Sequence, residues 1–408
     1  MLSKTRLVFN EKASGQTGTG AQDLTFLIRT DACFATSGFR QKLVSLLQQN
    51  VSAPVSSAPV FNPRALGQAS GVELEKDVKK SVHAAYEEWG HSILNSIAHH
   101  VNYDLYDINE SVRRLSVEFH DSRALAEKIA KNAEDFLSAQ PGHNDVPVVF
   151  VSLDEMFHKC RAPWGEVAFS RLFSLKGDQQ FGYIARPGRP PIDDQVKVFT
   201  QLLKDMQAQY GEKIRFVLLE DNVRHAKMLN WVIDLMDGHG VFDHAELACI
   251  STCFCSASQE ERQAIVHKGR SIPLVAAVEF SSKSFEVSTP RDLFFDGYVV
   301  EVEGELTRLP GLFMDVEKLF KVCPDKVDSF REEVRDASMR FCERIENEWN
   351  VNVPLSWFSC AKAIAHVTGA DEETPMLDIL KKLDISANKA LSLNAIGDLT
   401  GKPPAPSA

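Results

Sequence analysis

The sequence has little of what marks exported, membrane-spanning or nucleic-acid-binding proteins. Its eight cysteines in 408 residues are too sparse for a disulfide framework, so we expect free thiols in a reducing compartment. No run of about 18 apolar residues occurs, and the first residues turn polar before the apolar region of a signal peptide could form. Lys and Arg number 45 against 56 Asp and Glu, a net charge of −11, which disfavours generic attraction to nucleic-acid phosphates. We therefore predict a cytoplasmic protein that binds neither nucleic acid nor membrane.

What is present is the composition and patterning of an α/β protein. Hydrophobic residues make up 44% and charged residues 25%, enough to build a sizeable core. Apolar or β-branched runs at 24–30, 147–153, 180–185, 214–220 and 246–252 are typical of strands, and amphipathic segments between several of them are typical of helices. This alternation predicts a doubly wound, mostly parallel Rossmann-like sheet that contains all five strands.

The chain divides into four segments on composition. Residues 1–50 read as a flexible arm followed by the first strand and helix of the core. Residues 51–140 begin with a Pro-, Ser- and Ala-rich stretch and continue with helical periodicity, which predicts a helical, cap-like insert. Residues 141–259 carry the α/β core, in which WGEVAFSRLF is expected to be a helix. Residues 260–408 form a mixed extension, with a strand pair followed by helices at about 313–321, 324–348 and 373–392.

Polar residues close the predicted strands, where open parallel sheets bind ligands. Asp31 ends the first strand, Ser152 ends the strand after the insert, and Glu220 and Asp221 end the strand KIRFVLL. Lys197 lies near the start of the helix that leads to that last strand. A carboxylate can attack phosphorus or bind Mg²⁺, a hydroxyl and a lysine can hold phosphoryl oxygens, and further acids can complete a metal's oxygen shell. The set predicts a phosphoryl-transfer site.

In this order the residues resemble the motifs of the haloacid dehalogenase-like (HAD) superfamily, over residues 24–250. The resemblance implies that Asp31 is the nucleophile and that Ser152 and Lys197 hold the phosphoryl group. It also implies that Asp31, Glu220 and Asp221 bind Mg²⁺. The expected activity is hydrolysis of a phosphate monoester, with a phosphorylated small molecule or a phosphoprotein as substrate.

The first motif departs from the family pattern Asp-x-Asp-x-Thr, because Cys33 stands where the general acid is expected. A thiol replaces a carboxylic acid poorly at neutral pH. A second alignment reads FVSLDEMF as the first motif, with Ser152 at the nucleophile position and Asp154 at the acid position, and catalysis is then lost. We prefer the first alignment because it explains a helical block inside a sheet protein.

Two other functions stay open. A catalytically degenerate HAD-like domain would serve protein interaction through the helical regions. Alternatively, the acidic pair Glu220–Asp221 and the loop after it partly resemble phosphoribosyltransferases, which follow such a pair with a phosphate-binding loop at a helix N-terminus. Here that loop has Arg224, His225 and Lys227 in place of the family's Thr and Gly.

Zinc is disfavoured by the spacing of the cysteines. Cys249, Cys253 and Cys255 stand near His244 and His267, but alternation along CISTCFC puts the three thiols on one side of a strand. No CxxC pair is present. We expect these cysteines to be small core residues.

Overall fold

The computed structural model describes ten stretches of the chain together with the short strand β1, and every structural statement below concerns these residues: 6–9, 23–30, 37–52, 71–100, 114–140, 148–154, 165–175, 179–279, 285–288, 291–320 and 322–383. They belong to two compact units. The first comprises residues 1–29, 106–170 and 183–288, and the second comprises residues 30–105, 171–182 and 289–408.

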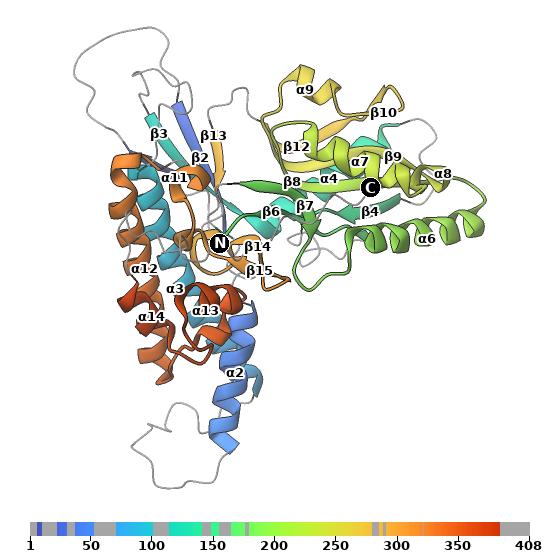
Figure 1. Ribbon diagram of the computed structural model, residues 1–408. Helices are drawn as coiled ribbons and strands as arrows, with labels where there is room; N and C mark the ends of the chain where they lie inside the picture. Colours follow the sequence, from blue (N-terminus) through green and yellow to red (C-terminus); the bar gives the residue numbers. More distant parts are fainter. Residues whose placement is uncertain are drawn as a thin grey trace, which may run out of the picture. The chain divides into compact units, whose positions relative to one another are not determined.

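A five-stranded, wholly parallel sheet forms the centre of the first unit (Figure 1). Its order is β12-β9-β8-β4-β5, with these bounds: β4 Val148–Ser152, β5 Gly165–Glu166, β8 Ile214–Val223, β9 Ala245–Cys255 and β12 Leu274–Glu279. The middle strands β8 and β9 are buried along most of their length, which explains why their sequences are continuous apolar runs without alternation.

Helices cover both faces of this sheet. Helices α6 (Ile192–Tyr210) and α7 (Lys227–Gly238) share one hydrophobic core with inward-facing side chains of β4, β8 and β9. Helix α4 (Ser122–Ser138) packs on β9 and β12. It lies on the opposite face, because Ile250 belongs to the α6–α7 core while the next residue, Ser251, donates its hydroxyl to the Ile129 carbonyl of α4 at 2.7 Å. The predicted α/β fold with a doubly wound, mostly parallel Rossmann-like sheet is confirmed.

The strand predicted at 24–30 does not belong to that sheet. It forms β2 (Asp23–Thr30), which lies in a separate four-stranded sheet of order β1-β3-β2-β13. The other strands of this sheet are β1 (Arg6–Phe9), β3 (Arg114–Asp121) and β13 (Phe285–Ser288). Strand β2 lies between β3 and β13, and β13 runs parallel to it. The prediction of one sheet for all five runs is therefore wrong. An apolar run indicates a strand, but its partners depend on contacts distant in sequence.

The region predicted as a helical insert, 51–140, also differs. It contains α3 (Gly71–His100) and α4, but β3 lies between them. Helix α3 belongs to the second unit and α4 to the first. The region is therefore not one cap-like body, and its helical periodicity gave no sign that the two helices have different packing partners.

A third sheet has the order β15-β14-β6-β7, and two further predictions about its strands are wrong. Within WGEVAFSRLF, where a helix was predicted, Gly165–Glu166 form β5 of the central sheet and Phe169–Phe173 form β6 of the third sheet. Strand β7 (Gln180–Ala185) also lies in the third sheet and not in the central one. Strands β14 (Tyr298–Val302) and β15 (Glu305–Leu309) form an antiparallel pair. Periodicity alone does not separate helix from strand in short apolar runs such as this one.

Helices and aromatic side chains dominate the second unit. Helix α12 (Val327–Trp349) packs along α3, where the Trp89 indole N–H donates to the Ser338 hydroxyl at 3.1 Å, and α2 (Ser37–Ser52) packs on α3. Edge-to-face contacts of Phe295 with Trp89 and Phe341, both with centroids 4.8 Å apart, continue this core.

The remaining short elements are α8 Val241–His244, α9 Gln259–Gln263, β10 Val266–His267, β11 Arg270–Ser271, α10 Arg291–Phe294, η3 Gly311–Phe313, α11 Val316–Phe320, η4 Pro324–Lys326, η5 Leu355–Trp357, α13 Ala361–Thr368 and α14 Met376–Lys382. None of the helices in the described ranges combines the length and the apolar composition that crossing a bilayer requires.

Candidate functional site

Polar side chains converge at the carboxyl edge of the central sheet, where β4 and β8 end side by side. The chain passes from β4 to β5 on one side of β4, and then through β6, β7 and α6 to β8 on the other side. A crevice at such a change of direction is the usual ligand site of open parallel sheets. Asp154 follows β4 here, and Glu220 and Asp221 lie near the end of β8.

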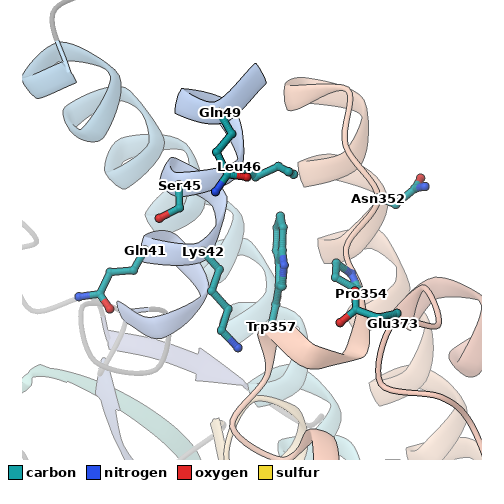
Figure 2. A pocket seen from close by; sticks show the side chains of 9 residues that line it. All are labelled: Gln41, Lys42, Ser45, Leu46, Gln49, Asn352, Pro354, Trp357 and Glu373. Atoms are coloured by element: carbon teal, nitrogen blue, oxygen red, sulfur yellow. The ribbon is translucent and has the colours of Figure 1, made fainter. Parts of the chain in front are cut away.

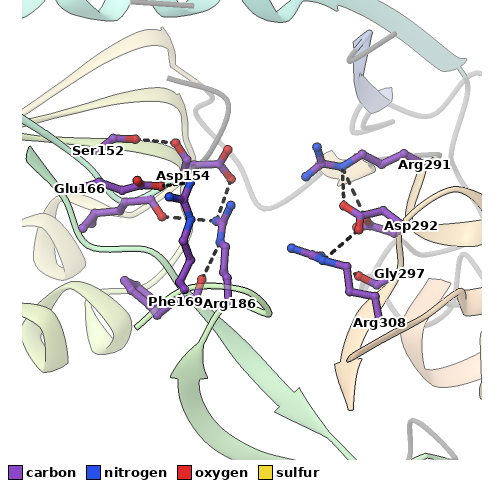
Figure 3. Close-up of polar contacts among 12 residues, drawn as sticks. Ser152, Asp154, Glu166, Phe169, Arg186, Arg291, Asp292, Gly297 and Arg308 are labelled. Carbon is purple, nitrogen blue, oxygen red and sulfur yellow. Dashed lines mark hydrogen bonds and ion pairs between the residues drawn. The ribbon is translucent and has the colours of Figure 1, made fainter. Parts of the chain in front are cut away.

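Arg186, which follows β7, is fixed at this edge by three acceptors (Figure 3). Its guanidinium donates to the Phe169 carbonyl at 2.9 Å and the Leu153 carbonyl at 3.3 Å, and it lies 3.4 Å from the Asp154 carboxylate. The Arg186 and Asp154 side chains are only 12% and 11% exposed, so water screens this ion pair weakly.

A second ion pair lies at the end of β5. Arg189 approaches the Glu166 carboxylate at 3.1 Å. Sequence reasoning missed Arg186, Arg189 and Glu166. The signal was present in the loop RPGRPP, which places two arginines directly after a strand.

The Glu220 carboxyl is the most perturbed acid of the site. It is 7% exposed, and its pKa is raised well above the usual range, chiefly by burial and then by the neighbouring charge and hydrogen bond of Asp221 and the charge of Asp154. The Arg186 charge opposes this shift. Glu220 therefore keeps its proton to higher pH than an ordinary glutamic acid, and its side chain is hydrogen-bonded to that of Asp221. While Glu220 is protonated, the pair offers both a hydrogen-bond donor and acceptors.

A three-residue loop, 224–226, separates β8 from α7. The N-cap residue of α7, Ala226, provides no side-chain hydrogen bond, so the backbone N–H groups of the first turn have no side-chain acceptor from the cap. The imidazole of His225 pairs with the Glu261 carboxylate at 2.7 Å, which ties this loop to α9. A helix N-terminus with such N–H groups attracts anions.

Of the other site residues predicted from sequence, the structure describes Ser152 and Lys197 but not Asp31. Ser152 is fully buried and its hydroxyl donates to the Asp154 backbone carbonyl. Lys197 is 64% exposed and pairs with Asp194 at 3.0 Å, within α6. Asp31 and Cys33 lie outside the described residues. Because β2 is not a strand of the central sheet, the argument that put Asp31 at this edge no longer holds.

Metal ligands are not evident in the described part of the chain, where no group of three or more His, Cys, Asp or Glu side chains is arranged to hold an ion. Cys249, Cys253 and Cys255 are fully buried in β9, as core residues are. Burial raises the pKa of the Cys249 thiol to about 12, so this thiol stays protonated.

Comparison with the models of known protein families, with curated proteins and with solved structures gives no match for this chain. The likenesses to HAD phosphohydrolases and to phosphoribosyltransferases therefore rest on the residues alone.

Proposed function

We propose that the carboxyl edge of the central sheet binds a phosphorylated sugar, in the manner of the phosphoribosyltransferases that the sequence partly resembles. The observation that carries the proposal is the acidic pair Glu220–Asp221 near the end of a central strand, followed by a short loop and the N-terminus of α7.

The protonation state of the acidic pair supports a sugar as ligand. A neutral carboxyl beside a carboxylate offers a donor and acceptors to neighbouring hydroxyl groups. The same pair is a poorer ligand set for Mg²⁺ while Glu220 keeps its proton, because a neutral carboxyl binds the cation more weakly than a carboxylate does.

The loop and helix that follow support a phosphate as the second part of the ligand. The uncapped first turn of α7 offers backbone N–H groups, and Arg224, His225 and Lys227 bring basic side chains to the same turn. This loop lacks the Gly and Thr of the family. Basic side chains would therefore make some of the phosphate contacts that backbone N–H groups make in those proteins.

Calorimetric titration with ribose 5-phosphate, ribose and inorganic phosphate tests the proposal. We expect ribose 5-phosphate to bind more tightly than either of its parts, because both halves of the site contribute to its affinity. Asp221→Asn should weaken ribose 5-phosphate but leave inorganic phosphate unchanged, and Lys227→Glu should weaken both phosphate compounds. Lys204→Glu, the same charge reversal at an exposed lysine of α6, is the matched control and should change nothing. Equal affinities for the sugar phosphate and for inorganic phosphate in all variants would refute the proposal.

Mg²⁺-dependent phosphoryl transfer of the HAD type is the second candidate. It is favoured by the approach of Asp154, which follows β4, to Glu220 of β8, since this brings acids from adjacent strands together. On this proposal Asp31→Asn abolishes hydrolysis of p-nitrophenyl phosphate, Lys197→Ala lowers it strongly, and Cys33→Asp raises turnover of alkyl phosphates. Absence of hydrolysis and of Mg²⁺ binding would leave the degenerate, partner-binding HAD-like domain.

We also propose a cytoplasmic location. The six cysteines in the described ranges are all free thiols, as is usual in a reducing compartment.

A further inference from the structure

A groove in the second unit lies between α2 and the segment that carries η5, and none of its lining residues belongs to the candidate site (Figure 2). It has a volume of about 410 Å³, within the range of binding sites. Its lining consists of an apolar set, Leu46, Pro354 and Trp357, and a polar set, Gln41, Lys42, Ser45, Gln49, Asn352 and Glu373.

Contacts made by the lining residues and by their neighbours hold the walls of the groove in place. The Lys42 ammonium donates to the Ser356 backbone carbonyl and so ties α2 to η5. The Trp357 ring stands edge-on to Phe39 of α2, with centroids 5.2 Å apart. The Leu355 N–H donates to the Thr374 carbonyl at 2.9 Å, and this hydrogen bond fixes the backbone next to Glu373. A ligand would therefore meet a preformed surface.

Several donors around the groove have no acceptor among the described residues. These are the side-chain amides of Gln41, Gln49 and Asn352 and the indole N–H of Trp357. By contrast, the indoles of Trp89 and Trp349 each donate to a serine hydroxyl at 3.1 Å. A polyproline II segment makes no internal hydrogen bonds, so its carbonyls need such donors while its rings pack on aromatic and apolar side chains. Donors beside a half-buried tryptophan suit this ligand class.

The chain itself contains a segment of this type. Residues 402–406 read Lys-Pro-Pro-Ala-Pro, a PxxP sequence directly preceded by a base, and Glu373 offers the opposite charge on the groove. Helix α14 starts at Met376, whose N–H donates to the Val353 carbonyl at 2.8 Å, next to the groove. Seven residues of helix span about 10 Å, so residue 383 stays near the groove. The 20 residues from 384 to 403 could span at most about 66–72 Å, so the chain is long enough for residue 403 to reach the groove.

We propose that the segment 402–406 docks in this groove as a polyproline II helix, with its prolines against Trp357 and Lys402 beside Glu373. Tethering gives the segment an effective concentration of the order of millimolar, so even a weak contact is largely occupied within one chain.

The first test is ¹⁹F NMR of the full chain labelled with 5-fluorotryptophan, in which Trp357→Phe assigns the Trp357 resonance. We expect the double variant Pro403→Ala, Pro406→Ala to shift this resonance and to leave those of Trp89 and Trp231 unchanged. Glu373→Lys should produce a similar shift, and Glu373→Lys combined with Lys402→Glu should restore the wild-type position. A Trp357 resonance that is identical in the wild type and the proline variant would overturn the proposal.

The second test uses a fluorescein-labelled peptide of residues 399–408 in anisotropy titrations. The full-length proline variant should bind it at least about fivefold more tightly than the wild type, whose own segment competes. Glu373→Lys introduced into the proline variant should weaken the peptide about two- to fivefold, as expected for an exposed ion pair, and a peptide with Lys402→Glu should recover that loss. Equal peptide binding by wild type and proline variant would mean that the groove serves a proline-rich segment of another protein, and would also overturn the assignment to residues 402–406.

Discussion

Replacing Glu220 by glutamine should change how the stability of the protein depends on pH. The folded state raises the pKa of this carboxyl, chiefly through burial. In the unfolded chain it has the ordinary value of about 4.3. Above that pH the unfolded state releases a proton that the folded state retains, so folding stability is fully present at lower pH and is lost as pH rises towards the folded-state pKa. Glutamine cannot ionise and should not show this loss.

The magnitude follows from proton linkage. While Glu220 stays protonated in the folded state, each pH unit removes about 1.4 kcal/mol from the free energy of unfolding. The coupling to Asp221 spreads the transition over both acids, so this slope is an upper value. Glutamine keeps a donor for Asp221, so the variant should match the wild type near pH 4 and become progressively the more stable of the two from pH 5 upwards.

The assay is urea denaturation at intervals between pH 4 and pH 8, followed by circular dichroism and tryptophan fluorescence. Trp231 of α7 is stacked on Tyr183, with centroids 4.5 Å apart, and so reports on the unit that holds Glu220. Glu212→Gln is the matched control, since Glu212 is an exposed glutamate just before β8 and its replacement should leave the pH profile unchanged. Parallel profiles for the wild type and Glu220→Gln would refute the claim that burial keeps this acid protonated.

Three further predictions follow from packing. Phe216→Ala should lower the free energy of unfolding by about 3–5 kcal/mol, because this ring is fully buried, whereas Phe181→Ala, at a ring 44% exposed, should cost less than about 1 kcal/mol by the same denaturation assay. Gly297→Ala should cost about 3 kcal/mol or more in thermal and urea unfolding, since the residue has φ 108° and an added Cβ would lie 2.2 Å from a backbone oxygen of β15; an unchanged melting temperature would contradict this. Brief treatment of the native protein with iodoacetamide, read by mass spectrometry, should label the half-buried Cys323 well before Cys249, whose pKa burial raises to about 12, and the reverse order would contradict the placement of β9.

Much of the central sheet could be predicted from sequence because its signals are local. The runs that form β4, β8 and β9 are predominantly apolar and do not alternate, since helices cover both faces of these strands, and such runs are recognisable without knowing their partners. The amphipathic periods of α6 and α7 are equally local. These features and the order of elements were enough to predict an α/β fold and to place Glu220 and Asp221 at a strand end.

Which strands pair with one another was decided only by the tertiary structure. The run that forms β2 reads as a strand as clearly as β4 does, yet it pairs with β3 and β13, and β13 lies more than 250 residues away in the chain. No property of residues 24–30 encodes that pairing, because each strand edge presents the same backbone groups and the choice depends on which faces become buried together. The role assigned to Asp31 depended on this choice.

At the acidic site, too, some features follow from the residue order and others from contacts between residues distant in sequence. The sequence by itself determined that Glu220 and Asp221 are adjacent and that an acid follows β4. Only the fold brings Asp154 and Arg186 to Glu220 and buries that carboxyl, and these contacts decide its protonation state. A carboxyl's pKa depends on solvent exclusion and on charges a few ångströms away, which are properties of the folded arrangement and not of the residue order.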